Sequence, residues 1–305
     1  MLATMLEAVP VELAMCVAGI ALLLIGMAAA KNTIAAARGL DKIVALAGLS
    51  VAVPLAVFGA LHLFGPQLVR DLVPRYMPWR MFWVYFVGCS LIAASLSTAT
   101  GIAVRWSGLL FGVMMFLFVA MIHLRGALAR PHDRIIWTIV VRETSFGGAG
   151  WILAGMAMDG WRAEGKSTLV TVGRVCVLLA AVVFGVEHFL HPTGLPGVPL
   201  VKQMPAWLPG RALIDYLTGA ALLVLAASML LARNTRIVAA GLGAWLLLLV
   251  VVMYGPILIA SLLQSSAGVK VEAINYFADT LLFAGVILAL ASASPRRPDE
   301  MAQPG

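Results

Sequence analysis

Charged side chains are scarce in this chain. Only 11% of its 305 residues are Asp, Glu, Lys or Arg, whereas 62% are hydrophobic, and the mean hydropathy is +1.00. Soluble domains carry charge on about 25% of their residues. The scarcity of charge therefore excludes an ordinary soluble globule and indicates that lipid is the main solvent of the chain.

Cysteine and catalytic motifs are also scarce. The three cysteines stand singly inside apolar runs, without a C-x-x-C pattern or a metal-ligand spacing: Cys16, Cys89 and Cys176. Such cysteines are typical of small buried hydrophobic side chains, so we predict no metal site. The sequence has no nucleotide-binding loop, nucleophile triad or soluble catalytic domain. It therefore assigns no catalytic residue and leaves open whether the protein is an enzyme.

Long charge runs are missing too, although the net charge is +7. The basic residues stand singly or in small groups between apolar runs, instead of lining one face of a helix. This distribution is typical of the loops of a membrane protein. We therefore expect the lipid bilayer, and no nucleic acid, among the partners of the chain.

Apolar stretches, in contrast, are abundant. A membrane-spanning helix needs about 20 mostly apolar residues, and the chain has successive stretches of this kind at 10–30, 43–64, 80–100, 105–124, 135–158, 168–190, 212–232, 236–262 and 273–293. Open strands would leave backbone groups unpaired in hydrocarbon. The predicted fold class is all-α, a polytopic integral membrane helical bundle of about nine spans.

The sequence also repeats itself. The segment VFGALHLFGP at 57–66 matches VFGVEHFLHP at 183–192, which aligns His62 with His188. After a longer second loop the register changes, and a second series of residues matches: Pro74, Pro78, Arg80, Tyr85, Gly88, Leu91, Ser97, Arg105 and Gly112 with Pro205, Pro209, Arg211, Tyr216, Gly219, Leu222, Ser228, Arg236 and Gly243. Apolar composition alone would not align prolines, arginines and a histidine.

The repeat divides the chain into four parts. We expect an N-terminal span and loop at 1–42, a four-helix repeat at 43–160, a second repeat at 161–293 and a polar, disordered tail at 294–305. Because four spans is an even number, both repeats enter the bilayer in the same sense, as parallel repeats related by an axis along the membrane normal. Lys and Arg are slightly more numerous on the C-terminal side, which predicts the cell membrane with the N-terminus outside and the C-terminus cytoplasmic.

Several polar residues lie inside the expected spans, toward the side on which the N-terminus lies. A charged residue at the centre of a span costs about 2.5 to 3.5 kcal/mol on insertion scales, so such residues face a partner, a cavity or a pathway. The candidates for ligand binding or proton handling are His62, Arg142, Glu143, Glu187, His188, Asn275 and Asp279. A buried structural network is the alternative interpretation.

Helix geometry suggests partners for these candidates. Adjacent residues of a helix point about 100° apart, so we expect Arg142 to pair with Glu187, and Glu143 with His188 or His62. Asn275 and Asp279 share one helix face. The near-terminal residues Asp215, His123 and His191 are expected to reach the membrane interface instead.

The matched histidines His62 and His188 also admit a haem interpretation, because two neutral imidazoles on facing helices can be axial ligands. This interpretation is the less favoured one, because haem ligation fixes no spacing between distant helices. In addition, His62 lies within about a turn of the end of its span, where interfacial hydrogen bonding is commoner.

Three motifs suggest a family. FG-x-x-H-x-x-x-P closes the first helix of the first repeat, a P-x-x-x-P loop precedes an aromatic-rich second helix, and RETSFGGAGWILAG at 142–155 lies in the fourth. Over about residues 43–293, each repeat resembles the DoxX-like family of small four-span membrane proteins. The second repeat has Asp279 and Gly285 in its last helix without a basic partner, and a doubled unit departs from single-unit members.

The resemblance implies a fold more than an activity. Some members of the family are associated with quinone-linked oxidation of sulfur compounds and others with redox-protective membrane complexes. The favoured hypothesis is a redox-associated integral membrane subunit that binds a quinone or another small hydrophobic ligand in a polar pocket on the outward side, with subunits of a redox complex as candidate partners. The alternatives are a small-molecule transporter and an assembly or scaffold protein without a ligand.

Overall fold

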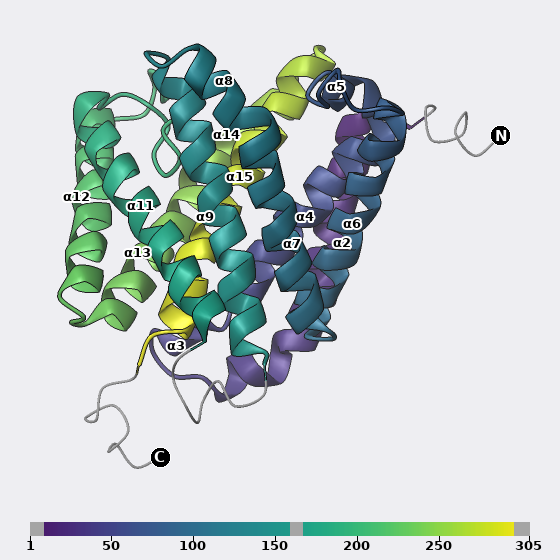
Figure 1. The fold of residues 1–305 in the computed structure, drawn as a ribbon. Helices are drawn as coiled ribbons and strands as arrows, with labels where there is room; N and C mark the ends of the chain where they lie inside the picture. Colours follow the sequence, from purple (N-terminus) through teal and green to yellow (C-terminus); the bar gives the residue numbers. More distant parts are fainter. Residues whose placement is uncertain (1–8, 159–166, 296–305) are drawn as a thin grey trace.

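The computed structural model describes residues 9–158 and 167–295, so the boundary expected at 160 and most of the expected tail lie outside the described residues. Within the described residues every regular element is a helix, and the only extended pairing is one antiparallel bridge between Gly194 and Gln203. The long helices run side by side as one bundle (Figure 1).

Within residues 9–158 and 167–295, nine helical stretches cross the bundle. In chain order they are α2 (Val11–Ala36); α3 (Asp41–Val44) with α4 (Ala47–Phe64); α6 (Arg80–Thr100); α7 (Val104–Phe118) with the π-helix η1 (Val119–His123) and α8 (Leu124–Ala129); α9 (Arg134–Met156); α11 (Thr168–Leu190); α12 (Arg211–Leu230); α13 (Thr235–Leu249) with the π-helix η2 (Val250–Tyr254) and α14 (Gly255–Leu262); and α15 (Ala267–Ser292). A short helix, α5 (Pro66–Arg70), lies in the connection after α4.

Eight of these stretches, within the described residues, are long and apolar enough to cross a membrane. The ninth, α9, has the length, with 23 residues, but carries Arg142 and Glu143 and a series of glycines in its middle. The predicted all-α polytopic membrane bundle of about nine spans is therefore confirmed, and the protein is a multi-pass membrane protein.

Of the boundaries that differ from the prediction, the end of the first helix and the start of the last differ most. The first helix continues to Ala36, because Lys31 and Asn32 extend it beyond the apolar run instead of ending it. The last helix begins at Ala267 rather than 273, because the Ser266 side chain accepts a hydrogen bond from the Val269 backbone and caps the helix start. In both cases polar residues that sequence analysis assigned to loops are helical.

The two halves of the bundle pack against each other through their first and last long helices. The first long helix of the first half, α4, packs against α15, the last helix of the second half, and α11 packs against α9 in the same way. Helices α9 and α15 also contact each other, so they form the centre of the bundle. Helix α2 lies outside this centre, against α4 and α6, as expected for a span without a counterpart. First-on-last contacts of this kind are what a pseudo-twofold axis between the halves produces.

The backbone of the two halves carries the same irregularities at the same sequence spacing. The π-helices η1 and η2 occupy matching places in the third span of each half. The left-handed residues between spans also match in pairs, namely Trp79 with Gly210, Gly101 with Ala232, and Ala103 with Asn234. These features support the repeat that the sequence alignment predicts.

Glycine permits the same helix crossing in both halves. A Cβ atom on Gly88 would lie 3.0 Å from the Cβ atom of His62, and one on Gly219 would lie 2.9 Å from that of His188. The first and second spans of each half therefore approach closely at these glycines. The crossing holds each histidine at the N-terminal end of the bundle, the end at which α2 begins.

Candidate functional site

The polar candidates form two separate groups instead of one pocket. The first group lies at the contact of the central helices α9 and α15. Arg142 donates one hydrogen bond to Asp279 Oδ2 at 2.8 Å and another to Glu143 Oε1 at 2.7 Å. All three side chains are at least four-fifths buried, with 16%, 11% and 11% exposure. One guanidinium thus joins two carboxylates between the two halves.

The expected partners of this group are wrong, and Glu143 pairs with Arg142 rather than with His188 or His62. Arg142 Nη2 lies 2.7 Å from Glu143 Oε1 although the two residues are adjacent in the helix. Its partner on another helix is Asp279 on α15, not Glu187 on α11. The interhelical partner follows from the contact of α9 with α15, which the sequence does not reveal.

Asn275 lies one helical turn before Asp279 and shares its face, as predicted. Its Oδ1 atom is buried and has no hydrogen-bond partner among the described residues, and the same holds for Nε of Arg142. The central group is therefore incompletely satisfied. A buried ion pair that bridges two halves fixes their register, whether or not it also handles protons.

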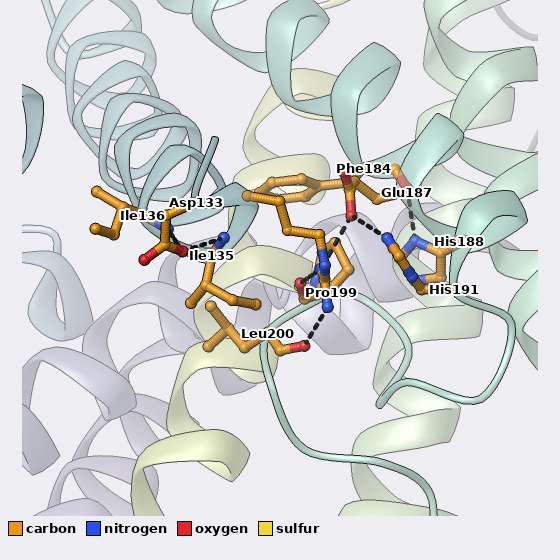
Figure 2. A network of polar contacts seen from close by, with 10 residues as sticks. Asp133, Ile135, Ile136, Phe184, Glu187, His188, His191, Pro199 and Leu200 are labelled. Carbon is orange, nitrogen blue, oxygen red and sulfur yellow. Dashed lines mark hydrogen bonds and ion pairs between the residues drawn. The ribbon is translucent and has the colours of Figure 1, made fainter. Parts of the chain in front are cut away.

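The second group lies at the N-terminal end of the bundle, where α11 ends and α9 begins (Figure 2). Arg134 at the start of α9 donates to Glu187 Oε2 at 2.9 Å and to the backbone oxygens of Pro199 and Leu200 at 3.1 and 3.4 Å. His191 lies 3.7 Å from the same carboxylate oxygen of Glu187. Glu187, expected to pair with Arg142, is thus held by Arg134, and these contacts fasten the 191–204 loop to the helix ends.

His188 has both ring nitrogens occupied. Nδ1 donates to the Phe184 carbonyl at 2.6 Å, and Nε2 accepts from the Gly197 backbone N–H at 3.0 Å. This pattern assigns the neutral tautomer with the proton on Nδ1. His62 makes the equivalent contact to Phe58 at 2.8 Å. Because Nε2 of His188 is already an acceptor, the arrangement does not fit a haem ligand pair.

A cavity of about 250 Å³ lies under the 191–204 loop. Its buried part includes His188 on α11 and Asp215 on α12, and its rim includes Arg134 and His191. Glu143 and Glu187 are not among its described lining residues. Of the candidates His62, Arg142, Glu143, Glu187, His188, Asn275 and Asp279, the cavity is therefore lined by His188 alone.

Asp215 is the residue that sequence analysis missed. It was expected to reach the interface, but it is only 1% exposed, because the 191–204 loop folds over the start of α12. Neither carboxylate oxygen has a hydrogen-bond partner among the described residues. Oδ1 lies 3.7 Å from His188 Nε2, and the carboxyl group also interacts with the Gly194 backbone amide. The aligned residue of the first repeat is Val84, and this apolar-to-acidic difference was the available signal.

Comparisons with protein-family models, with curated proteins and with solved structures find no match. The resemblance of the two halves to the DoxX-like family therefore stays a prediction. The described residues also contain no group of three or more His, Cys, Asp or Glu side chains that could hold a metal ion.

Proposed function

We propose that the protein is a redox-associated membrane subunit that binds a quinone, or a similar small hydrophobic molecule with a polar head, in the cavity under the 191–204 loop. The observation that carries this proposal is the cavity itself, which has a buried carboxylate and a buried imidazole on its floor. Buried ionisable groups that border an open space inside a membrane protein are typical of a ligand site.

The size of the cavity favours a head group over a whole ligand. Sites that enclose a drug-sized molecule measure about 300 to 1,000 Å³, and this cavity measures about 250 Å³. A longer ligand must therefore leave part of its length outside. The rim residues Leu190 and Val201 are 64% and 69% exposed, so an apolar tail can pass over them toward the lipid.

The cavity is formed before any ligand binds, because its loop is fixed at several points. The Tyr254 hydroxyl donates to the Pro196 carbonyl at 2.7 Å, and Leu195 and Met204 are buried beside Tyr254. A loop with this many contacts loses little further entropy on binding, which favours affinity. With the N-terminus outside, as the loop charges suggest, the ligand enters from the outward side, where subunits of a redox complex are accessible.

Ligand-induced stabilisation tests the proposal. A Cβ atom on Gly194 would point into the cavity, 3.9 Å from Asp215 Oδ2, whereas one on Gly241 of α13 would meet no atom within 4 Å. We expect a short-tailed quinone or quinol at 100 times its Kd to stabilise the wild type by about 2.7 kcal/mol. The variant Gly194→Leu should lose this stabilisation, and Gly241→Leu should keep it. Equal stabilisation of both variants would place the ligand elsewhere.

A transporter is the second candidate, and the π-helices favour it. Interrupted helices at corresponding positions of two repeats are typical of transporters, and η1 and η2 interrupt the third span of each half at matching positions. π-Helical turns are frequent at functional sites. Flux of a quinone-like solute into proteoliposomes would favour this candidate, whereas binding without flux would favour the redox-associated subunit. A copurifying partner protein without either would indicate a scaffold.

A further inference from the structure

We infer that the cavity selects a ligand whose head donates a hydrogen bond, and that Asp215 is the acceptor that anchors it. This inference rests on the proposed function and specifies it. Among quinone-type ligands, it assigns the reduced, hydroxyl-bearing quinol as the preferred form and the oxidised quinone as the weaker one.

On the cavity floor, the group that can still form a hydrogen bond is an acceptor, the Asp215 carboxylate. Asp215 is 1% exposed, and, apart from the interaction of its carboxyl group with the Gly194 backbone amide, neither of its oxygens has a hydrogen-bond partner among the described residues. His188 Nε2, at 3.7 Å from Oδ1, cannot donate to it, because this nitrogen accepts from Gly197. A carboxylate removed from water with so few partners is unfavourable, so a ligand head that donates to it relieves part of that cost.

In contrast, neither the His188 ring nor the Gly197 amide has a donor left for a ligand. Nδ1 of His188 donates to Phe184, and the Gly197 N–H donates to His188. The Arg134 guanidinium donates to Glu187 and to the 199–200 backbone. A quinone has only acceptor oxygens, so at the floor it would face the Asp215 carboxylate without a donor between them. A quinol hydroxyl supplies that donor.

The fold does not require an acid at this place. The first half reaches the same backbone arrangement with Val84 at the aligned position, where the side chain is also 1% exposed. Asp215 is therefore a local addition to the repeat. A buried polar residue that the scaffold does not need, at the floor of a cavity, is explained by the ligand that it contacts.

The inference is tested with a quinol and a quinone that share one ring and one short tail. Binding to the full chain in detergent is measured anaerobically, by ligand-dependent shift of the unfolding midpoint and by direct titration. We expect the wild type to bind the quinol about tenfold or more tightly than the quinone, the factor expected for one hydrogen bond to a charged group. In Asp215→Asn, which is similar in size and offers an N–H₂ donor, the preference should shrink or reverse.

A second variant and a third ligand test whether Asp215 and a hydroxyl head produce the preference. Asp215→Val, which introduces the residue of the first repeat, should lose the preference without losing the fold, and its unfolding midpoint without ligand reports on folding. An alkylammonium with the same tail tests a cationic donor against a neutral one. Tighter binding of the alkylammonium than of the quinol would overturn the assignment of a hydroxyl head.

The failures of the two proposals are distinguishable. Equal affinity of the wild type for quinol and quinone would overturn the inference about Asp215 and leave quinone binding intact. Absence of binding of both forms to a folded wild type would overturn the proposed function itself. An unchanged quinol preference in both Asp215→Asn and Asp215→Val would also overturn the inference, because the selectivity would then come from another group.

Discussion

At the end of the bundle where α2 begins, the two halves have the same backbone arrangement but different side chains. In the first half, Leu61 and Val84 are buried in an apolar cluster that includes Val69 of the short helix α5. The aligned residues of the second half are Glu187 and Asp215, and a cavity lies there instead. The comparison shows that the repeated features determine the fold, whereas the acid on the cavity floor, Asp215, occurs in the second half only.

The connecting segments produce this difference. After α4, the chain forms α5, which packs Val69 onto the apolar end of the first half. After α11, the connection 191–210 is longer than the connection 65–79, and its 191–204 part is held in place by several contacts, including Arg134 to the Pro199 carbonyl and the Gly197 amide to His188. An insertion of a few residues in a loop costs little conformational entropy, so a cavity can be added to one repeat without a change in its helices.

The largest effect is expected at the contact that joins the halves. Replacing Arg142 with Met keeps most of the side-chain volume but leaves Glu143 and Asp279 buried without their cation. Breaking a buried ion pair by removing one partner costs about 3 to 5 kcal/mol. We expect a loss of that size in the free energy of unfolding, measured by denaturant titration in detergent. Arg105→Met on the exposed surface is the control and should change it by less than about 0.5 kcal/mol.

The double variant Arg142→Met with Asp279→Asn sharpens this prediction. If the two side chains act as one pair, the double variant should be less damaging than the sum of the single variants, by about 0.5 to 3 kcal/mol. Strict additivity would mean that the ion pair does not contribute to the contact between α9 and α15.

The spans and the repeat could be predicted because they depend on local signals. Apolar length predicted the helices, and the bounds 80–100 and 168–190 agree with α6 and α11. The boundary errors at Ala36 and Ala267 arose where polar residues continue a helix. Sequence patterns report where apolar residues end, but capping and tertiary packing decide where helices end.

The arrangement of the polar groups could be predicted only in part. Burial of Arg142 beside acidic partners follows from the cost of charge in hydrocarbon. The identity of the partner on another helix, Asp279, depends on which helices meet, and one sequence does not contain that information. The burial of Asp215 could have been predicted from the alignment, because the matching residue of the first repeat is the apolar Val84. Both residues are buried in the structure.

Exchanging the aligned residues Val84 and Asp215 tests whether a buried acid is tolerated in the second half only. Val84→Asp places a carboxylate in a packed apolar cluster, and we expect it to destabilise the protein by at least about 2 kcal/mol. Asp215→Val removes an unpartnered buried acid and should be neutral or stabilising by up to about 1 kcal/mol. Thermal unfolding of both variants without ligand provides the measurement. Similar losses in both variants would contradict the difference between the two ends.

The smallest effect is expected where the halves are most alike, at the glycines of the repeated crossing. A Cβ atom on Gly88 or Gly219 would lie 3.0 or 2.9 Å from the Cβ atom of the facing histidine. Overpacking costs about 1 to 3 kcal/mol, while replacing glycine with alanine in a helix gains about 0.5 to 1 kcal/mol. The cost of overpacking therefore exceeds the gain in helix stability. Gly88→Ala and Gly219→Ala should each lose about 1 kcal/mol in the free energy of unfolding.

Gly241→Ala on α13 is the matched control for these two glycines, because a Cβ atom there would meet nothing within 4 Å. It should gain the helical contribution alone, so its unfolding midpoint should rise. Equal losses at Gly88 and Gly219 would support one shared crossing, since the two positions face equivalent histidines on α4 and α11. A loss at Gly219 only would mean that the first half tolerates a wider crossing, and that the two halves differ in packing as well as in chemistry.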